Sequence, residues 1–349
     1  MPQRIKQIKH WLETELQADI HSFAPASNDA SFRRYFRVVF NNTIAEQAAG
    51  QAFIIMDAPP EKENIGPFID IASRLEMTGI HVPHIYAVNE ASGFIMMSDL
   101  GNTAYLSVLN SDSGREQADK LYSDAMKALL VLQKGMQQDI QQHTIALADY
   151  DAARLKSEMD LLPDWYIKVH CQQTLNDVDQ AVLDQAMSRL IESAQEQPQV
   201  FVHRDYHSRN LMFYAGHNPG VIDFQDAVIG PITYDLVSLL RDSYIAWPDD
   251  KVYQWLEQYR QMLLTEKLLP EDNKQQFIRW FDWMGIQRQL KVVGIFCRLN
   301  YRDGKNHYLN DIPQTLDYLF TVCARYPEFE PLLQLLIRLD NEKKAADHL

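Results

Sequence analysis

The sequence predicts an α+β fold of two lobes, in which a small antiparallel β lobe with a helix precedes a large, mainly helical lobe. Three observations lead to this class. The 349 residues exceed the usual size of a single hydrophobic core. Over about the first 100 residues the patterns follow the order strand, strand, helix, strand, strand. From Gly101 onward helical spacing dominates, so we expect one lobe at residues 1–100 and the other at 101–349.

Each element of the small lobe has its own signal. Two helices are indicated by apolar residues that share one face, and the second helix ends near Gly79. The residues of the two faces are Ile5, Ile8, Leu12 and Leu16, and Phe68, Ile71, Ala72 and Leu75. Strands are expected at 31–40 ("SFRRYFRVVF") and 51–56 ("QAFIIM"). A hairpin is expected at 84–97, where "HIYAV" and "FIMM" flank the turn "NEASG".

The large lobe is predicted from long helical patterns with one β-like interruption. The helices are expected at about 115–136, 150–162, 177–195, 234–246, 251–264, 274–302 and 313–340. Before the fourth of these, "VFVH", "LMFY" and "GVIDF" read as short strands, and "AGHNPG" forms a turn between the last two. We expect the functional site where the lobes meet, near a connector at 98–101.

Composition narrows the classes of partner. The formal net charge of −14 opposes non-specific attraction to nucleic acid or to an anionic membrane. Apolar runs such as 52–56 are too short to cross a bilayer, and the opening "MPQRIKQIKHWLETEL" lacks the apolar stretch of a signal peptide. Three scattered cysteines argue against a disulfide framework and favour a reducing compartment. We therefore expect a cytoplasmic monomer with a small-molecule partner, and neither nucleic acid nor a membrane as partner.

The stretch "FVHRDYHSRNLMFYAGHNPGVIDFQDAV" carries the clearest chemical signal. Asp205 stands five residues before Asn210, and Asp223 follows thirteen residues after Asn210. If 211–214 and 220–223 pair as an antiparallel hairpin, Asn210 and Asp223 lie side by side at its open end. An amide oxygen and a carboxylate suit Mg²⁺, which completes its shell with waters and substrate phosphates. Asp205 would orient and deprotonate a hydroxyl nearby, which is the arrangement that phosphoryl transfer requires.

These residues resemble the signatures of kinases. The segment "HRDYHSRN", followed by "DFQ" at 223–225, is similar to the H-R/G-D-x-x-x-x-N and Asp-Phe-Gly elements. With "GPITYDLVSLLRD" following, the resemblance narrows to the aminoglycoside phosphotransferase and choline kinase superfamily, which has a protein-kinase-like fold. Within it, "DASFRRYFRV", "MDAPPEKEN" and "SEMDLLPDWY" look most like bacterial kinases that phosphorylate the anomeric hydroxyl of N-acetylmuramate and N-acetylglucosamine in cell-wall recycling. The resemblance covers about residues 20–330.

The resemblance implies roles for individual residues. These are Asp205 as the catalytic base, Asn210 and Asp223 as metal ligands, and Ser98 and Leu100 as the connector whose backbone meets adenine. It further implies that Asp235 braces the loop that carries Asp205. ATP and Mg²⁺ are the implied cofactors. The implied reaction transfers the γ-phosphoryl group to the C1 hydroxyl of an N-acetylated amino sugar.

Two departures from the general kinase pattern concern the nucleotide. The loop "SNDASFRRYF" contains no glycine, so its backbone cannot approach the phosphates as a Gly-rich loop does. Met56 stands about where such enzymes carry an ATP-holding lysine. Either the protein is a pseudokinase, which binds nucleotide or a partner without catalysis, or another cation replaces that lysine. We favour Arg33 or Arg34, beside Ser31 in the same loop, and Lys62 is a further candidate.

The helix expected at 274–302 carries a basic stripe. Its members fall within a narrow arc of the helix and are Arg288, Lys291, Arg298 and Arg302. One interpretation is a solvated face near a helix C-terminus, where cations are favoured. The other is a landing site for a carboxylate, such as the lactyl group of N-acetylmuramate, with Arg288 and Arg298 as contacts.

Aromatic residues bear on the choice of acceptor. Trp165 and Trp247 would stack on a pyranose face if they border the site, although aromatic residues in helical lobes usually belong to the core. An aminoglycoside kinase would instead need an acidic acceptor cleft. A choline kinase would need an aromatic cage for a quaternary nitrogen.

Overall fold

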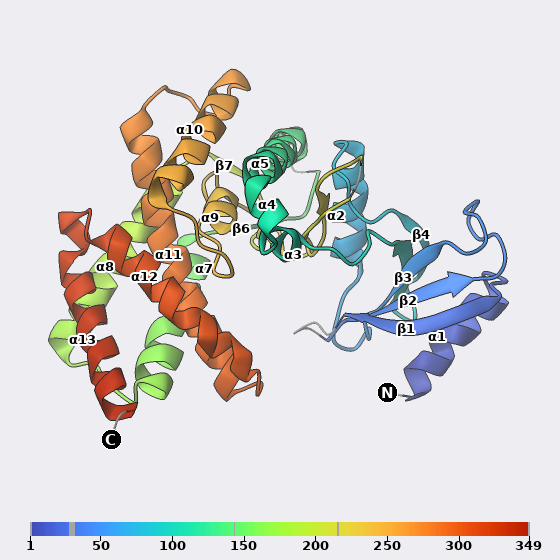
Figure 1. Cartoon of the computed structure of the whole chain (residues 1–349), viewed down its shortest axis with the longest axis horizontal. Helices are drawn as coiled ribbons and strands as arrows, with labels where there is room; N and C mark the ends of the chain where they lie inside the picture. The colour runs from blue at the N-terminus through green and yellow to red at the C-terminus, as the bar shows by residue number, and fades with distance from the viewer. Residues whose placement is uncertain (1, 28–31, 143, 215, 348–349) are drawn as a thin grey trace. The chain divides into compact units, whose positions relative to one another are not determined.

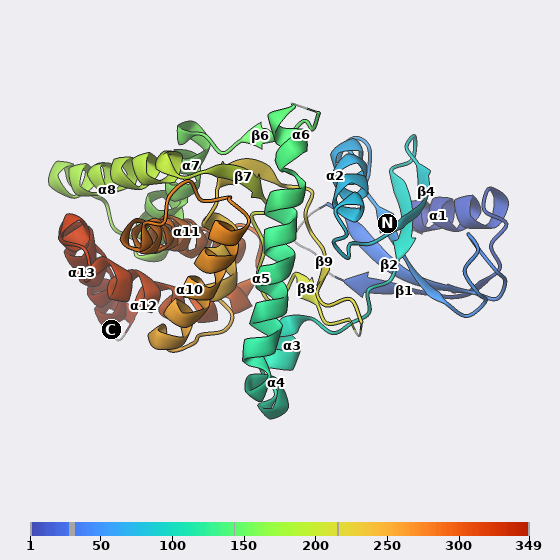
Figure 2. The ribbon, with the colours of Figure 1, turned by 90° about the horizontal axis from the view of Figure 1, so that it is seen from above.

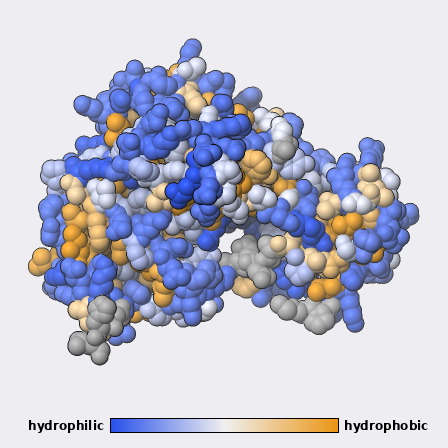
Figure 3. Space-filling model, viewed as in Figure 1, coloured by the Kyte–Doolittle hydropathy of each residue, from blue (hydrophilic) through white to orange (hydrophobic). Residues whose placement is uncertain are grey.

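The structure, a computed structural model, describes residues 2–27, 32–142, 144–214 and 216–347. The chain divides into two compact units. Unit 1 comprises Met1–Ala104 and Leu211–Gln225, and unit 2 comprises Tyr105–Asn210 and Asp226–Leu349. Much of the surface in Figure 3 is hydrophilic, with apolar side chains in small groups. None of the helices in the described part of the chain has the length and apolar character that a membrane crossing requires.

Unit 1 is built on a five-stranded antiparallel sheet in the order β1-β2-β3-β5-β4 (Figure 1). Its elements are α1 (Pro2–Thr14), β1 (Ile20–Ser27), β2 (Arg34–Phe40), β3 (Ala52–Asp57), α2 (Gly66–Met77), β4 (Ile85–Asn89) and β5 (Phe94–Ser98). The predicted antiparallel lobe is confirmed, and so is the predicted hairpin, which β4 and β5 form.

Strand β2 and helix α1 share one hydrophobic core. Phe36, Val38 and Phe40 are buried and alternate with less buried residues along β2. They belong to the same cluster as Ile8 and Trp11 of α1. A period of two is what a strand with one covered face requires, so the alternation in "RYFRVVF" places α1 on this face.

The edge strand β1 is absent from the elements predicted above. Its sequence "IHSFAPAS" includes Pro25 and lacks a clear alternation of apolar and polar residues. It lies beside β2 at the edge of the sheet, with register shifts between Ile20 and Ser22 and between Pro25 and Ser27. An edge position tolerates proline because one side of the strand makes no ladder hydrogen bonds. Pairing with β2, rather than local pattern, explains this strand.

A short hairpin from later in the chain belongs to unit 1. Its strands are β8 (Leu211–Met212) and β9 (Gly220–Val221), which pair antiparallel. The Val221 amide donates to the His81 carbonyl over 2.8 Å, and the rings of Phe224 and Phe68 stack with centroids 5.0 Å apart. The predicted hairpin is therefore confirmed, with strands shorter than expected.

Unit 2 is mainly helical (Figure 2). Its helices are α3 (Tyr105–Leu109), α4 (Asp112–Glu116), α5 (Ala118–Gly135), α6 (Gln137–Gln141), α7 (Ala152–Met159), α8 (Asp177–Glu196), α9 (Tyr234–Leu240), α10 (Asp249–Thr265), α11 (Lys274–Tyr301), α12 (Ile312–Cys323) and α13 (Glu330–Asp347). A π-helix spans Leu162–His170, and 3₁₀ helices span Asn306–Asp311 and Pro327–Phe329. A small sheet has the order β6 (Ala148–Asp149), β10 (Val228–Pro231), β7 (Gln199–Val202).

Two predicted helices of this unit were wrong in their extent. The single helix expected at 313–340 is divided into α12 and α13 by a 3₁₀ helix that begins at Pro327, because a proline lacks the amide that would continue the hydrogen bonds of a helix. The helix expected at 234–246 ends at Leu240. Past this end the Asp242 carboxylate accepts the Tyr244 amide over 2.9 Å, which favours a turn in place of another helical turn.

Helix α11 is the central packing element of unit 2. It contacts α7, α8, α9, α12 and the π-helix (Figures 1 and 2). All residues from Phe281 to Gly294 are buried, including the charged Arg288 and Lys291. A helix that is buried on every side is usually apolar. Charged residues in such a position require partners or a function.

Candidate active site

The loop at 203–210 is held by a buried carboxylate of α9. Asp235 accepts the amide of His203 over 2.6 Å and the amide of Arg204 over 3.0 Å. Arg204 has a φ of 75°, a conformation that is uncommon for residues other than glycine. Burial raises the pKa of Asp235 to about 7, although the two backbone amides favour its charged form. Asp235 thus braces the loop, as the resemblance implies.

A second carboxylate holds the other end of this loop. Asp242 accepts the Ser208 amide over 2.9 Å and the Ser208 hydroxyl over 2.5 Å. Within the loop, the Asp205 carbonyl accepts the His207 amide and the Asn210 side-chain amide, each over 3.0 Å. Together with the bonds to Asp235, these bonds hold the backbone of the loop on both sides of Asp205, which limits where its carboxylate can lie.

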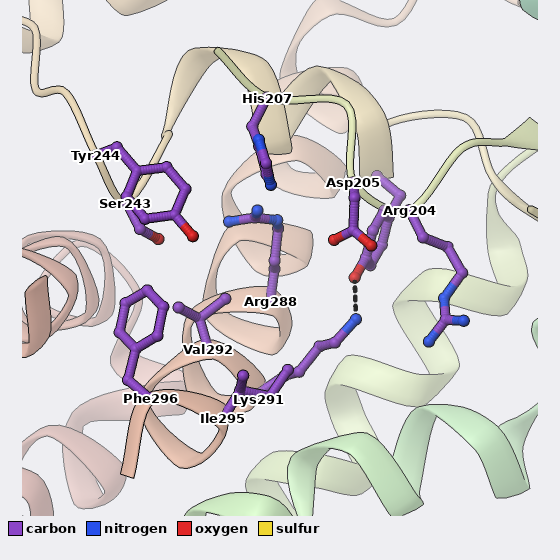
Figure 4. A pocket seen from close by; sticks show the side chains of 11 residues that line it. Arg204, Asp205, His207, Ser243, Tyr244, Arg288, Lys291, Val292, Ile295 and Phe296 are labelled. Carbon is purple, nitrogen blue, oxygen red and sulfur yellow. Dashed lines mark hydrogen bonds between the residues drawn. The ribbon is translucent and has the colours of Figure 1, made fainter. Parts of the chain in front are cut away.

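A small, open hollow of about 80 Å³ lies beside this loop within unit 2 (Figure 4). Its polar lining consists of Arg204, Asp205, His207, Tyr234, Ser243, Tyr244, Arg288 and Lys291, and its apolar lining consists of Val292, Ile295 and Phe296. The lining combines one carboxylate, several cationic groups and an apolar wall from α11, which suits a small polar ligand with an anionic group.

Glu158 of α7 neutralises two of the cations that line the hollow. Its carboxylate forms ion pairs with Arg204 and, over 3.2 Å, with Lys291. It also accepts the hydroxyl of Tyr150, and Lys291 donates to the Tyr234 hydroxyl over 2.9 Å. Burial alone would raise the pKa of Glu158, but the positive charges of Lys291 and Arg204 hold it below its usual value. This network orders one wall of the hollow.

Cations near Asp205 keep its carboxylate ionised. Burial would raise its pKa, but the positive charges around it, of which Lys291 contributes most and Arg288 also contributes, lower it overall. Burial lowers the pKa of His207, which favours its neutral form. An ionised carboxylate on a rigid loop can accept a proton from a hydroxyl that lies in the hollow.

The structure brings together some of the predicted acceptor contacts and not others. Asp205 and Arg288 line the same hollow, whereas Arg298 and Trp165 are not among the residues that line it. Trp165 is partly buried and packs against the core of unit 2. The interpretation of the basic stripe as a solvated face is wrong for Arg288 and Lys291, which are 4% and 7% exposed, because α11 is covered by its neighbouring helices. Of the four residues of the stripe, only Arg302, which pairs with Asp303 over 2.8 Å, agrees well with the interpretation as a solvated face.

The arginines predicted to bind nucleotide have carboxylate partners in unit 1. Arg33 pairs with Glu63 over 3.0 Å, and Arg34 pairs with the buried Asp57. Asp57 also pairs with Arg4 over 2.5 Å. Ser31 lies outside the described residues.

The remaining nucleotide residues lie on or beside β5. Ser98 belongs to β5, and its hydroxyl accepts the His84 amide over 2.9 Å. Leu100 is buried two residues later. Met56 of β3 is fully buried opposite Tyr35 and Ile95, as an apolar core residue would be.

The two predicted metal ligands lie in different units. The amide of Asn210 is oriented by its bond to the Asp205 carbonyl. Asp223 has a φ of 67° and accepts a hydrogen bond from Gln225 over 2.6 Å. Among the described residues no group of three or more His, Cys, Asp and Glu side chains forms a metal cage. The chemistry of one amide oxygen and one carboxylate fits Mg²⁺, which takes few protein ligands and binds substrate phosphates as well.

Several residues of the site were not predicted from the sequence. They are Glu158, Asp242, Ser243, Tyr244, Val292, Ile295 and Phe296. Glu158 lies in "SEMDLLPDWY", a stretch that contributes to the resemblance. Its position in that stretch was the sequence signal that could have indicated a role for Glu158 in the site. The α11 residues follow from Arg288 at offsets of four, seven and eight, so the helical face of that arginine would have indicated them.

Comparison with known proteins agrees with this geometry. The model of the phosphotransferase enzyme family matches residues 22–272. A protein of Pseudomonas putida named N-acetylmuramate/N-acetylglucosamine kinase is 40% identical over 98% of both chains. A protein of Neisseria meningitidis with the same name is 37% identical, also over 98% of both chains.

Solved structures show the same fold at low identity. The choline kinase LicA from Streptococcus pneumoniae has a TM-score of 0.61 at 10% identity, covering 91% of this chain and 99% of that chain. The ADP-bound aminoglycoside phosphotransferase APH(2'')-Ib has a TM-score of 0.56 at 15% identity, covering 89% and 97%. They confirm the kinase-like α+β fold, and the family match over most of the chain confirms the resemblance. The chain belongs to the phosphotransferase enzyme family.

Proposed function

We propose that this protein is an ATP-dependent sugar kinase that transfers the γ-phosphoryl group to the C1 hydroxyl of N-acetylmuramate and N-acetylglucosamine, in peptidoglycan recycling. The observation that carries the proposal is the full-length similarity, at 37–40% identity, to proteins named N-acetylmuramate/N-acetylglucosamine kinase. The hollow beside Asp205 supports it, since its polar lining offers hydrogen-bonding groups that suit a monosaccharide.

In this proposal Asp205 orients the C1 hydroxyl and accepts its proton as the hydroxyl oxygen attacks the γ-phosphorus. Asp235 and Asp242 support the reaction by holding the loop that carries Asp205. The pair formed by Glu158 and Lys291 keeps a positive charge beside the Asp205 carboxylate, which favours its ionised form. Positioning of this kind accounts for much of the catalysis of phosphoryl transfer.

The nucleotide and the metal ion follow from family membership. Similar structures contain ADP or AMP, and ATP is the donor that we propose. We propose Asn210 and Asp223 as ligands of Mg²⁺, which would supply neutralisation of charge on the phosphates.

Residues of unit 1 are proposed to bind the nucleotide itself. Ser98 and Leu100 would meet adenine, and Ser31, Arg33 and Arg34 would serve the phosphates. Arg34 is the better candidate for phosphate binding than Arg33, because its partner Asp57 is shared with Arg4 and one carboxylate cannot neutralise two guanidinium groups.

The remaining proposals concern location and assembly. The acidic composition and the low cysteine content, three in 349 residues, are in keeping with a cytoplasmic monomer that has no nucleic acid or membrane partner. We propose residues 1–100 as the nucleotide-binding lobe and 101–349 as the catalytic and substrate lobe.

The charge of the hollow disfavours other acceptors. Arg204, Arg288 and Lys291 line it, and they would repel a polycationic aminoglycoside or the quaternary nitrogen of choline. A pseudokinase is disfavoured because Asp205, Asn210 and Asp223 are all present in the sequence, which a degraded site would have little reason to retain together.

A coupled assay of ADP release tests the function. Purified full-length protein with ATP and Mg²⁺ is given N-acetylmuramate, N-acetylglucosamine, kanamycin or choline in turn. We expect turnover with the two amino sugars. The NMR signals of the free reducing end of the sugar should disappear during the reaction, because C1 of the product carries the phosphate. Turnover with kanamycin or choline alone would overturn the proposal. ATP binding without turnover of any acceptor would favour the pseudokinase.

A further inference from the structure

The guanidinium of Arg288 is buried in the hollow without a partner. Arg288 is 4% exposed, and its Nη1 has no hydrogen-bond acceptor. Throughout the described ranges no carboxylate lies within ion-pair distance of this guanidinium. A buried charge in this state is unfavourable unless something else supplies the counter-charge.

The other cations that line the hollow differ from Arg288 in this respect. Arg204 and Lys291 both pair with Glu158, and Lys291 also donates to Tyr234. Their charge is therefore largely satisfied within the protein. Arg288 interacts with the Asp205 carboxylate only at longer range, so it is the cation of the lining that keeps N–H groups for a ligand.

The surroundings of Arg288 indicate what kind of ligand this is. Its guanidinium lies beneath the ring of His207, in the same hollow as the Asp205 carboxylate (Figure 4). The Ser243 hydroxyl, which also lines the hollow, is buried without a hydrogen-bond partner. Val292 and Phe296 provide an apolar wall nearby. Two unpaired donors next to an apolar wall suit a carboxylate that carries a small alkyl group.

We propose that Arg288, together with the Ser243 hydroxyl, binds the carboxylate of the lactyl group of N-acetylmuramate and thereby sets the preference for this sugar over N-acetylglucosamine. A guanidinium offers paired N–H groups that match the two oxygens of a carboxylate. N-Acetylglucosamine carries a hydroxyl in place of the lactyl ether, so it gains no ionic contact from Arg288. This inference rests on the proposed function and adds a residue that determines specificity.

A different role for Arg288 makes a different prediction. If the arginine neutralised charge on the transferred phosphoryl group, its removal would slow both sugars equally, because that group is the same in both reactions. If it binds the lactyl carboxylate, its removal affects N-acetylmuramate selectively.

The experiment measures kcat/KM of the full-length enzyme for both sugars and for the methyl ester of N-acetylmuramate. The variants are Arg288→Met, Arg288→Lys and Ser243→Ala. The matched control is Arg279→Met, which changes an arginine of the same helix that is 45% exposed and pairs with Glu328. For Arg288→Met we expect kcat/KM to fall by roughly 10- to 100-fold more for N-acetylmuramate than for N-acetylglucosamine, as for loss of one charge-assisted contact. A smaller loss shared by both sugars is expected as well, because Arg288 contributes to the positive charge around Asp205.

The ester and the remaining variants supply independent tests. The parent enzyme should discriminate against the methyl ester, and Arg288→Met should treat ester and acid alike. Arg288→Lys should keep part of the preference, Ser243→Ala should lose a smaller part, and Arg279→Met should keep all of it. A thermal melt of each variant, compared with that of the parent enzyme, shows that the variant is folded.

Several outcomes would overturn the inference. These are an equal loss for both sugars in folded Arg288→Met, an unchanged ratio of the two sugars in that variant, or equal use of ester and acid by the parent enzyme. The comparison of ester and acid uses only the parent enzyme, so it tests the inference even if Arg288→Met does not fold. Failure of the parent enzyme to phosphorylate either sugar would instead remove the proposed function itself.

Discussion

Each unit contains one buried carboxylate that is held by two cations. In unit 1, Asp57 pairs with Arg4 and Arg34, and in unit 2, Glu158 pairs with Arg204 and Lys291. Asp57 is 0% exposed and Glu158 is 7% exposed. As charge arrangements the two clusters are nearly the same.

They differ in what the cations border. Arg4 belongs to α1 and also donates to the Ser92 carbonyl over 2.6 Å, so the Asp57 cluster ties this helix to the end of β3. Both cations of the Glu158 cluster instead line the hollow that contains Asp205. The Asp57 cluster thus ties a helix to the sheet in the first unit, where Arg34 is also a proposed phosphate contact, whereas the Glu158 cluster lines the hollow beside Asp205 in the second. The neighbours of the pair, rather than the pair itself, decide its role.

The largest effect should come from the carboxylate beside the Glu158 cluster. We expect Asp205→Asn to lower kcat by about 10²- to 10⁴-fold, the usual contribution of a general base, with little change in thermal stability. Steady-state kinetics and thermal melts check this. If the variant retained more than about a tenth of the parent activity, Asp205 would not be the base, and the two clusters would lose their main functional difference.

A second large effect is expected in unit 1, away from its ion-pair cluster. Asp223→Ala should reduce turnover to less than about a tenth without unfolding the chain, because it removes a proposed Mg²⁺ ligand. Asp57→Asn is the matched control, since it changes a carboxylate of the same unit that the proposal assigns to no metal. Titration of activity with Mg²⁺ would show a higher requirement in any partly active Asp223 variant. An unchanged requirement together with normal turnover would contradict the metal role.

Changing the two cluster carboxylates themselves should separate stability from substrate binding. Glu158→Gln and Asp57→Asn should each lower the free energy of unfolding by about 3 kcal/mol, since each leaves two cations without their carboxylate. Only Glu158→Gln should also raise the KM for the sugar, by roughly tenfold, because Arg204 and Lys291 line the hollow. Urea unfolding and sugar kinetics on both variants test this. Equal effects of the two variants on the KM for the sugar would show that the Glu158 cluster contributes no more to sugar binding than the Asp57 cluster does.

The smallest effect concerns pH. The pKa of Glu158 is lowered in the folded protein, so its contribution to stability is complete above its unfolded value of 4.5 and is lost as the pH falls through the lower folded value. The difference in unfolding free energy between the parent protein and Glu158→Gln should therefore be largest near neutral pH and shrink below about 4.5. Urea unfolding at several pH values measures it, and a difference that grew in acid would have the wrong sign.

Local patterns in the sequence were sufficient for much of the fold. The apolar faces of α1 and α2, the β4–β5 hairpin and the β8–β9 hairpin all follow from periods of 3.6 or two and from turn residues. Local sequence patterns failed where contacts with another part of the chain decide the structure. Strand β1 depends on β2, and the end of α9 depends on hydrogen bonds made by Asp242. The break before α13 was available from Pro327 but was outweighed by the helical spacing on either side.

By itself the sequence determined most of the order of the elements, the kinase-like spacing of Asp205, Asn210 and Asp223, and the family, because these depend on residues that are close along the chain. Only the tertiary structure decided which cations of α11 are buried, that Glu158 satisfies Lys291, and that Arg288 remains without a partner. The physical reason is that burial and ion pairing depend on what packs against a helix from distant parts of the chain. The same spacing of arginines on α11 would have suited a solvated face equally well.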